Sequence, residues 1–221
     1  MSQLSASFRK EILLQWRTRH RFLAVLAFGA TSLLLFSFAI GPDSGALRLH
    51  SAGFLWLALL LSSTLTLAES FQTELEQKAM EGLLLLPTSE RAIFYGKALA
   101  NWTQLALLGA ALIPVMVILY DAGTTDLLRL AAIILLGSAG LSAPGTLYAA
   151  MSSGTKGRQM LLPLLLFPLV VPLLLASVKA TSLIILGDPM QQMSAWTVLL
   201  VSFDLISWSL CGILFGRVVE E

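Results

Sequence analysis

The sequence predicts an all-α integral membrane protein with six transmembrane helices, and three observations support this fold class. Hydrophobic residues make up 57% of the 221 residues and charged residues only 12%, whereas soluble domains carry about 25% charged residues. The apolar residues are gathered into six runs, each long enough for a helix to cross ~30 Å of hydrocarbon. The alternation of a membrane barrel is absent, and lipid-exposed backbone must satisfy its own hydrogen bonds, so the runs are predicted to be helices.

The six predicted spans form a single membrane domain over residues 1–221 with short connections. They lie at residues 22–40, 52–68, 99–120, 130–151, 160–178 and 194–215. The remaining residues are too few for a soluble domain. Cys211 is the single cysteine, which excludes an internal disulfide. The net charge of +1, with no basic face beyond the N-terminus, gives no indication of a nucleic-acid partner.

The lysine and arginine residues predict the orientation of the chain. If the N-terminus is inside, eleven of the 14 basic residues lie inside and three, Arg48, Arg129 and Lys179, lie outside. Cytoplasmic loops carry such an excess of lysine and arginine. Both termini and the loop between the second and third spans are therefore predicted to be cytoplasmic.

An amphipathic helix is predicted before the first span, at residues 3–18. Its apolar residues recur every four positions and so share one helical face; they are Leu4, Phe8, Ile12 and Trp16. Arg9, Lys10 and Arg17 lie off that face. The pattern predicts an interfacial helix, apolar side toward membrane lipids. A purely topogenic basic segment is the alternative.

Residues 69–97 concentrate charge between two apolar runs and are predicted to hold a cytoplasmic coupling helix. Its apolar residues again recur every four positions: Phe71, Leu75, Ala79 and Leu83. This ridge is predicted to bury against a soluble partner, with Glu74 and Glu81 fixing the register. The helix is expected to end near Gly82 or before Pro87. The alternative is a helix that lies on the membrane without a partner.

The same segment resembles the cytoplasmic signature of type-2 ABC-transporter permeases. The resemblance rests on Glu81-Gly82, the leucines 83–86, Pro87, Thr88-Ser89 and Gly96-Lys97. Nearly the whole chain resembles the haem exporter B family of cytochrome c maturation permeases. This resemblance is carried by Ile40-Gly41-Pro42, the LLSSTLTLAESF run at 60–71, LLLLP at 83–87, SAPGT at 142–146 and the proline-rich run at 162–174.

The family resemblance implies a non-catalytic permease subunit in a bacterial inner membrane. Its implied partners are a cytoplasmic ABC ATPase and a Trp-rich haem-handling membrane subunit, with haem as cargo. ATP hydrolysis would drive haem export or the release of a haem-loaded chaperone. The chain has no G-x-x-x-x-G-K-[ST] motif, so the ATPase is expected on another chain. Its five tryptophans are scattered, mostly near the ends of the predicted helices, where an interfacial belt is predicted.

Two further residues are candidates for chemistry. Asp204 falls midway through the sixth span, where a carboxylate is costly and faces protein or water; a buried polar packing network is the alternative. His50 precedes the second span on the outside and is a weak candidate for ligating haem iron. Two rival functions remain open: an ion- or proton-coupled carrier centred on Asp204, and a passive scaffold that assembles its partners.

Overall fold

The structure, a computed structural model, is all-helical over the residues that it describes, which are 3–17, 19–76, 90–123, 126–152 and 158–220. The helices are α1 (Gln3–Arg17), α2 (Arg19–Ile40), α3 (Ser44–Glu76), α5 (Glu90–Tyr120), α6 (Leu127–Ser152), α7 (Arg158–Leu186) and α8 (Met193–Glu220). Six of them, α2 to α8, are long and apolar enough to cross a membrane. The predicted fold class is confirmed.

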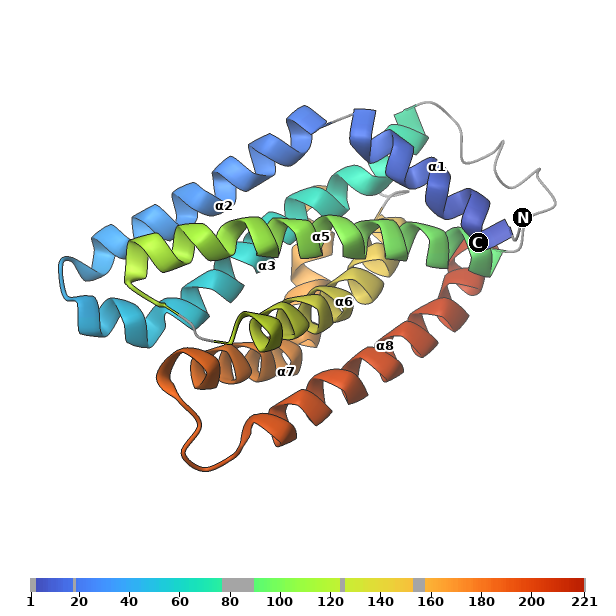
Figure 1. Cartoon of the computed structure of the whole chain (residues 1–221). Helices are drawn as coiled ribbons and strands as arrows, with labels where there is room; N and C mark the ends of the chain where they lie inside the picture. Colours follow the sequence, from blue (N-terminus) through green and yellow to red (C-terminus); the bar gives the residue numbers. More distant parts are fainter. Residues whose placement is uncertain (1–2, 18, 77–89, 124–125, 153–157, 221) are drawn as a thin grey trace.

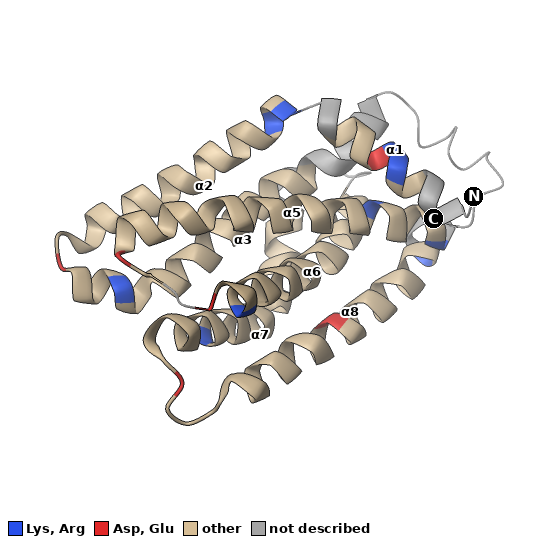
Figure 2. Ribbon diagram, viewed as in Figure 1, with Lys and Arg blue, Asp and Glu red and all other residues tan. Residues whose placement is uncertain are grey.

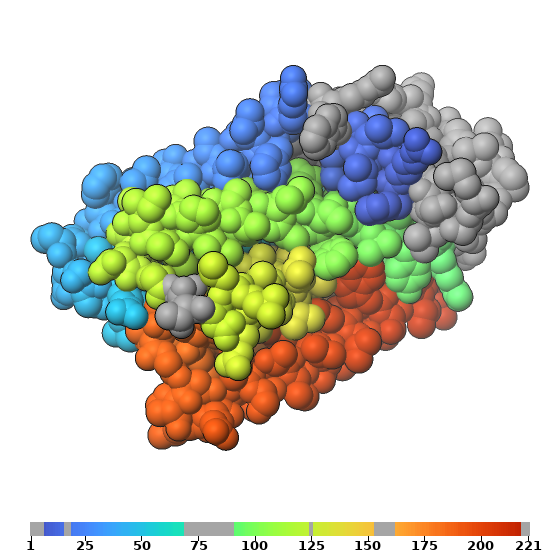
Figure 3. Space-filling view, viewed as in Figure 1, coloured from blue at the N-terminus to red at the C-terminus, as the bar shows by residue number. Residues whose placement is uncertain are grey.

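The six long helices run up and down in one bundle, and both termini lie at the same end of it (Figure 1). The helix α6 occupies the centre, because it is buried along most of its length and packs against α3, α5, α7 and α8. The helix α2 lies at the edge of the bundle against α3 and α5 (Figure 3). The N-terminal helix α1 packs on α5 at the end that carries the termini.

Several helices are longer than the apolar runs that predict them. The predicted second span, 52–68, is the middle of α3, which runs from Ser44 to Glu76. At about 1.5 Å per residue α3 is about 50 Å long, more than the hydrocarbon thickness. The third span likewise begins at Glu90 rather than at residue 99. Hydropathy identifies only the apolar middle of each helix. The backbone hydrogen bonds of the helix continue into its polar ends.

Aspartate side chains precede three of the helices at the end opposite the termini and accept hydrogen bonds from backbone amides there. Asp43 Oδ1 accepts hydrogen bonds from the Gly45 and Ala46 amides, at 2.9 and 3.1 Å, at the start of α3. Asp126 Oδ1 accepts from the Arg129 amide in α6. Asp188 lies five residues before α8 and accepts from the amides of Gln192 and Met193, where that helix begins. These side chains satisfy amide donors that have no partner within the helix. The loops are therefore short turns that return the chain directly into the bundle.

Tryptophan side chains connect helices of the bundle by donating hydrogen bonds to a hydroxyl or a backbone carbonyl of a neighbouring helix. Trp56 Nε1 donates to Thr181 Oγ1 at 2.9 Å, linking α3 to α7. Trp102 Nε1 donates to the Leu135 carbonyl of α6 at 2.8 Å. The interfacial position predicted for the tryptophans is wrong for Trp56, which is 1% exposed. Its indole N–H finds a partner inside the protein, so the ring is not held at the membrane surface.

Candidate functional sites at the basic end and in the bundle core

The two ends of the bundle differ in charge. The end with the termini carries Arg19, Arg21, Arg91, Lys97 and Arg217 among the described residues (Figure 2). At the opposite end Figure 2 shows the aspartates of the connecting turns, and the basic residues there are Arg48, Arg129 and Lys179. This uneven distribution separates the bundle into a basic end and an end where acidic and basic side chains nearly balance.

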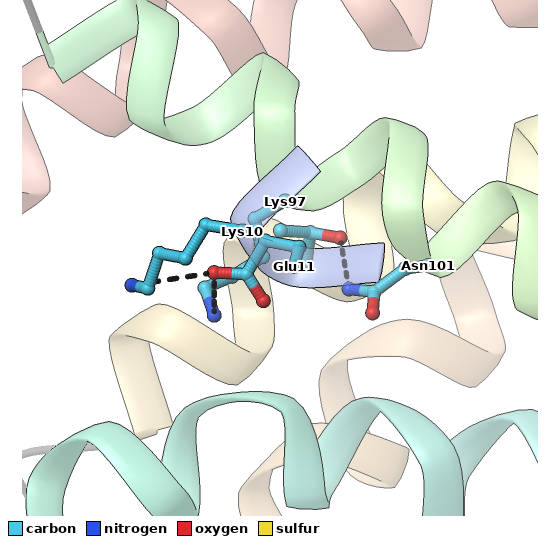
Figure 4. A network of polar contacts seen from close by, with 5 residues as sticks. Lys10, Glu11, Lys97 and Asn101 are labelled. Carbon is cyan, nitrogen blue, oxygen red and sulfur yellow. Dashed lines mark hydrogen bonds and ion pairs between the residues drawn. The ribbon is translucent and has the colours of Figure 1, made fainter. Parts of the chain in front are cut away.

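A buried ion pair joins α1 to α5 at the basic end. Lys97 Nζ lies 3.5 Å from Glu11 Oε1, and the two residues are 2% and 8% exposed. Lys10 Nζ approaches the same carboxylate oxygen at 3.6 Å from the more exposed side. Figure 4 shows Glu11 between the two lysines. Lys97 therefore places a charge well inside the helical bundle, where Glu11 compensates it.

A glycine allows α1 to come this close to α5. A Cβ atom at Gly96 would overlap the side chain of Ser7 and lie 3.2 Å from the backbone nitrogen of Phe8. One turn further along α5, Asn101 Nδ2 donates to Thr146 Oγ1 of α6 at 2.9 Å. The Gly96-Lys97 dipeptide thus provides both the space and the charge that dock α1, and Asn101 continues the polar contacts toward α6 (Figure 4).

The apolar pattern of α1 gives no indication that Glu11 is buried. It predicts an apolar ridge on α1, of which Phe8 and Ile12 are half-buried in the structure, while nothing is described for the side chains of Leu4 and Trp16. Its charge could have indicated a special role, because Glu11 is the only acidic residue between Met1 and residue 42. Leu13 and Leu14 remain 56% and 39% exposed on α1, so the helix has a docked side and an open apolar side.

The predicted coupling segment, 69–97, is divided between two long helices at its ends. Residues 69–76 are the last turns of α3 and residues 90–97 are the first turns of α5. Three of the six predicted coupling residues therefore belong to α3: Phe71, Glu74 and Leu75. The other three, Ala79, Glu81 and Leu83, lie outside the described residues. The segment connects helices that reach the basic end, where α1 is also docked.

Asp204 is the second buried carboxylate, and it lies within the bundle rather than at its end. It falls near the middle of α8, where Figure 2 shows an acidic band, and is 9% exposed. A Cβ atom at Gly140 would be 2.6 Å from Asp204 Oδ1 and 2.5 Å from Leu173 Cδ1. Neither carboxylate oxygen has a hydrogen-bond partner among the described residues. The sequence placed Asp204 inside the membrane but could not identify these neighbours.

His50 lies near the start of α3 at the end opposite the termini. It is exposed, and its ring is 6.1 Å from the ring of Phe54, measured between centroids. Phe54 in turn stacks on Phe36 of α2 at 4.9 Å. Within the described ranges there is no group of three histidine, cysteine or acidic side chains that could hold a metal ion. The structure thus gives His50 aromatic neighbours and solvent access, but no second ligand from those residues.

Comparison with known proteins identifies the family. The profile of the CcmB protein family matches residues 2–220. The chain is 34% identical over 174 residues to heme exporter protein B of Rhodobacter capsulatus, covering 78% of this chain and 79% of that protein. It is 32% identical over 177 residues to heme exporter protein B of Paracoccus denitrificans, covering 80% and 81%.

The Pseudomonas aeruginosa heme exporter protein B is 31% identical over 180 residues, which is 81% of each chain. These matches extend through the spanning helices rather than one motif, in agreement with the six-helix bundle. The chain therefore belongs to the CcmB protein family.

Proposed function

We propose that this chain is the membrane permease subunit of an ATP-driven complex in c-type cytochrome biogenesis, with haem as its cargo. The observation that carries the proposal is the family match over residues 2–220, together with relatives named heme exporter protein B. The six-helix bundle suits a transport subunit. Whether the energy of ATP moves haem itself or releases a haem-loaded chaperone, the chain acts as the membrane partner.

A separate cytoplasmic ABC ATPase supplies the energy in this proposal. The sequence has no Walker-type phosphate-binding motif, so nucleotide binding belongs to another chain. A second proposed partner is a Trp-rich membrane subunit that handles haem. In this chain, Trp56, Trp102 and Trp208 donate hydrogen bonds to neighbouring helices. The excess of lysine and arginine supports a cytoplasmic location for the basic end, with the bundle in a bacterial inner membrane in this proposal.

The coupling segment is the proposed contact with the ATPase. It joins α3 to α5 at the basic end, so a force on it acts on two spanning helices at once. Residues 90–97 begin α5, and Lys97 is paired to Glu11. A push on the segment would therefore reach α1 as well as the bundle.

A co-purification experiment tests the coupling contact. Leu75→Asp places a charge on the predicted apolar ridge, and burying one leucine is worth roughly 1.5–3 kcal/mol, which is about one to two decades in affinity. We expect Leu75→Asp to lose the ATPase at normal membrane abundance, whereas Glu76→Ala, on another face of the segment, retains it. Full recovery of the ATPase with Leu75→Asp would show that this segment is not the docking site.

A second candidate function is a proton- or ion-coupled carrier centred on Asp204. The buried carboxylate without a described partner favours it. In that case Asp204→Asn abolishes cytochrome c maturation at normal protein levels. Maturation that survives Asp204→Asn, with only reduced abundance in Asp204→Leu, supports a packing role for this residue. Maturation that persists with a hydrolysis-deficient ATPase would instead point to a passive scaffold.

A further inference from the structure

We infer that Asp204 is a proton-binding site within the membrane: it holds its carboxyl group protonated where α8 meets α6 and α7. This inference does not depend on haem as the cargo. It concerns the chemical state of one side chain and rests on its burial, its neighbours and the backbone of α6.

The surroundings of Asp204 do not stabilise a negative charge. Its Oδ1 lies against the Gly140 position on α6, beside the Leu173 methyl groups of α7. Both oxygens lack a hydrogen-bond partner in the described part of the chain. An unpaired charge in an apolar interior costs several kcal/mol even after relaxation. A carboxyl group in this position is therefore far more stable as the neutral acid.

The charged and titratable groups on these three helices lie away from Asp204 along the helices. Those whose side chains are described are Arg129 and Tyr148 on α6, Lys179 on α7, and Cys211 and Arg217 on α8. Tyr148 is eight residues from Gly140, Cys211 is seven from Asp204, and Lys179 is six from Leu173. Even six residues correspond to about 9 Å along a helix. None of these groups is a hydrogen-bond partner of the carboxyl group.

The backbone of α6 offers a hydrogen-bond acceptor for the acid proton of Asp204, close to Gly140. Pro144 lies inside α6 and has no N–H, so the carbonyl of Gly140 lacks its usual helical donor. The neighbouring carbonyl, of Ala139, accepts from Trp208 Nε1 at 3.1 Å. A protonated Asp204, one turn before Trp208 on α8, supplies a donor beside the Gly140 carbonyl, which has lost its usual helical donor to the proline.

A second polar group without a partner lies on the same face of α6. The Ser177 hydroxyl of α7 is buried and also has no described hydrogen-bond partner. It lies against Gly137, where a Cβ atom would be 2.9 Å from its oxygen. Gly137 and Gly140 are three residues apart and share a helical face. Two glycines of α6 thus make room for two oxygen-bearing side chains from neighbouring helices.

Labelling with dicyclohexylcarbodiimide tests the inference on the full chain in native membranes. In this reaction the carboxyl oxygen bonds to the central carbon of the reagent while the acid proton moves to a reagent nitrogen. The product keeps all atoms of both molecules, so the mass rises by one reagent molecule. The reagent is apolar and requires a protonated carboxyl group. We expect an adduct on the peptide that contains Asp204 at neutral pH, detected by mass spectrometry.

Three comparisons make the result decisive. Labelling falls to background in Asp204→Asn, and it is unchanged in Asp126→Asn, whose carboxylate is exposed and paired with Arg129 at 3.0 Å. Replacing choline chloride with sodium chloride leaves labelling unchanged. A wild-type chain without an adduct on Asp204 would show an ionised, solvated carboxylate and overturn the inference. Protection by sodium would also overturn it, because the site would then bind a metal cation.

A stability measurement separates this role from folding. Asparagine keeps the shape and a donor, so the Asp204→Asn protein is expected to unfold at the wild-type temperature in detergent. Leucine removes the donor, so Asp204→Leu is expected to unfold at a lower temperature. If Asp204→Asn is as unstable as Asp204→Leu, the native side chain carries a charge that the amide cannot replace, and the inference fails.

Discussion

At the scale of single residues, Glu11, Lys97 and Asp204 are the ionisable acidic and basic side chains that are buried among the described residues. Lys97 is compensated by Glu11 across two helices. Asp204 has no such partner among the described residues and is assigned the neutral form instead. The two solutions follow from the same physics: a buried charge is retained only where a partner of opposite sign repays its desolvation.

The ion pair gives a prediction for stability. Lys97→Met leaves Glu11 partly buried without its main partner, and breaking a buried pair costs about 3–5 kcal/mol. The thermal unfolding temperature in detergent should fall accordingly. Glu11→Gln should also destabilise the protein, and the double variant should recover part of the loss.

Lys10→Met is the matched control for this cycle, because the Lys10 side chain is 42% exposed. An exposed pair contributes at most about 1 kcal/mol, so this variant should unfold close to the wild-type temperature. Additive effects of Lys97→Met and Glu11→Gln would show that the two residues do not form a pair in the folded protein.

At the scale of elements, α6 organises the bundle because small residues allow other helices to approach it. Gly137 faces Trp56 of α3, Gly140 faces Asp204 of α8, and Gly145 faces Leu67 of α3. Membrane helices gain little from the hydrophobic effect when they associate, because lipid is equally apolar. Their association is stabilised by close packing and hydrogen bonds instead. The α6 helix therefore owes its central place to its small side chains rather than to its hydropathy.

Matched alanine substitutions test this account of the packing. A Cβ atom at Gly137 would overlap the Trp56 ring, so Gly137→Ala should cost about 1–3 kcal/mol through overpacking. At Gly53, in α3, nothing lies within 4 Å of a Cβ atom. Gly53→Ala should therefore be neutral or stabilise the helix by up to about 1 kcal/mol. Equal thermal unfolding temperatures for the two variants would contradict the crossing of α3 and α6.

At the scale of the whole molecule, the uneven charge distribution gives the bundle a direction. The docked α1 helix, the ends of α3 and α5, and both termini share the basic end (Figures 1 and 2). The proposed ATPase contact lies at this end too. A partner that binds there contacts elements that are far apart in the sequence but adjacent in space.

Reporter fusions test this orientation. Because lysine and arginine are retained in the cytoplasm, a fluorescent or phosphatase reporter should register the cytoplasm when fused after Lys78, Lys156 or Glu221. Fusions after Asp43, Asp126 or Asp188 should register the opposite side. A cytoplasmic signal after Asp126 would be incompatible with six spans in the proposed orientation.

The helical class, the six spans and the unequal charge of the two ends can be predicted from the sequence alone. Each depends on local properties: the length of an apolar run, the backbone's need for internal hydrogen bonds, and the positions of lysine and arginine. The cap of α3 is also local, because Asp43 accepts from amides only two and three residues further along the chain. The family signature at Gly96-Lys97 also marked the position that docks α1, although not its partner.

Which side chains meet depends on how the helices pack against one another. The sequence does not reveal that Glu11 pairs with Lys97, that Trp56 is buried, or that Asp204 lies against Gly140. In a soluble helix an apolar stripe marks the core-facing side, but a spanning helix is apolar all round. Lipid and protein neighbours are equally compatible with leucine, so hydropathy cannot separate them. The inner faces are set by contacts between small and polar residues distant in sequence, and these exist only once the helices have packed.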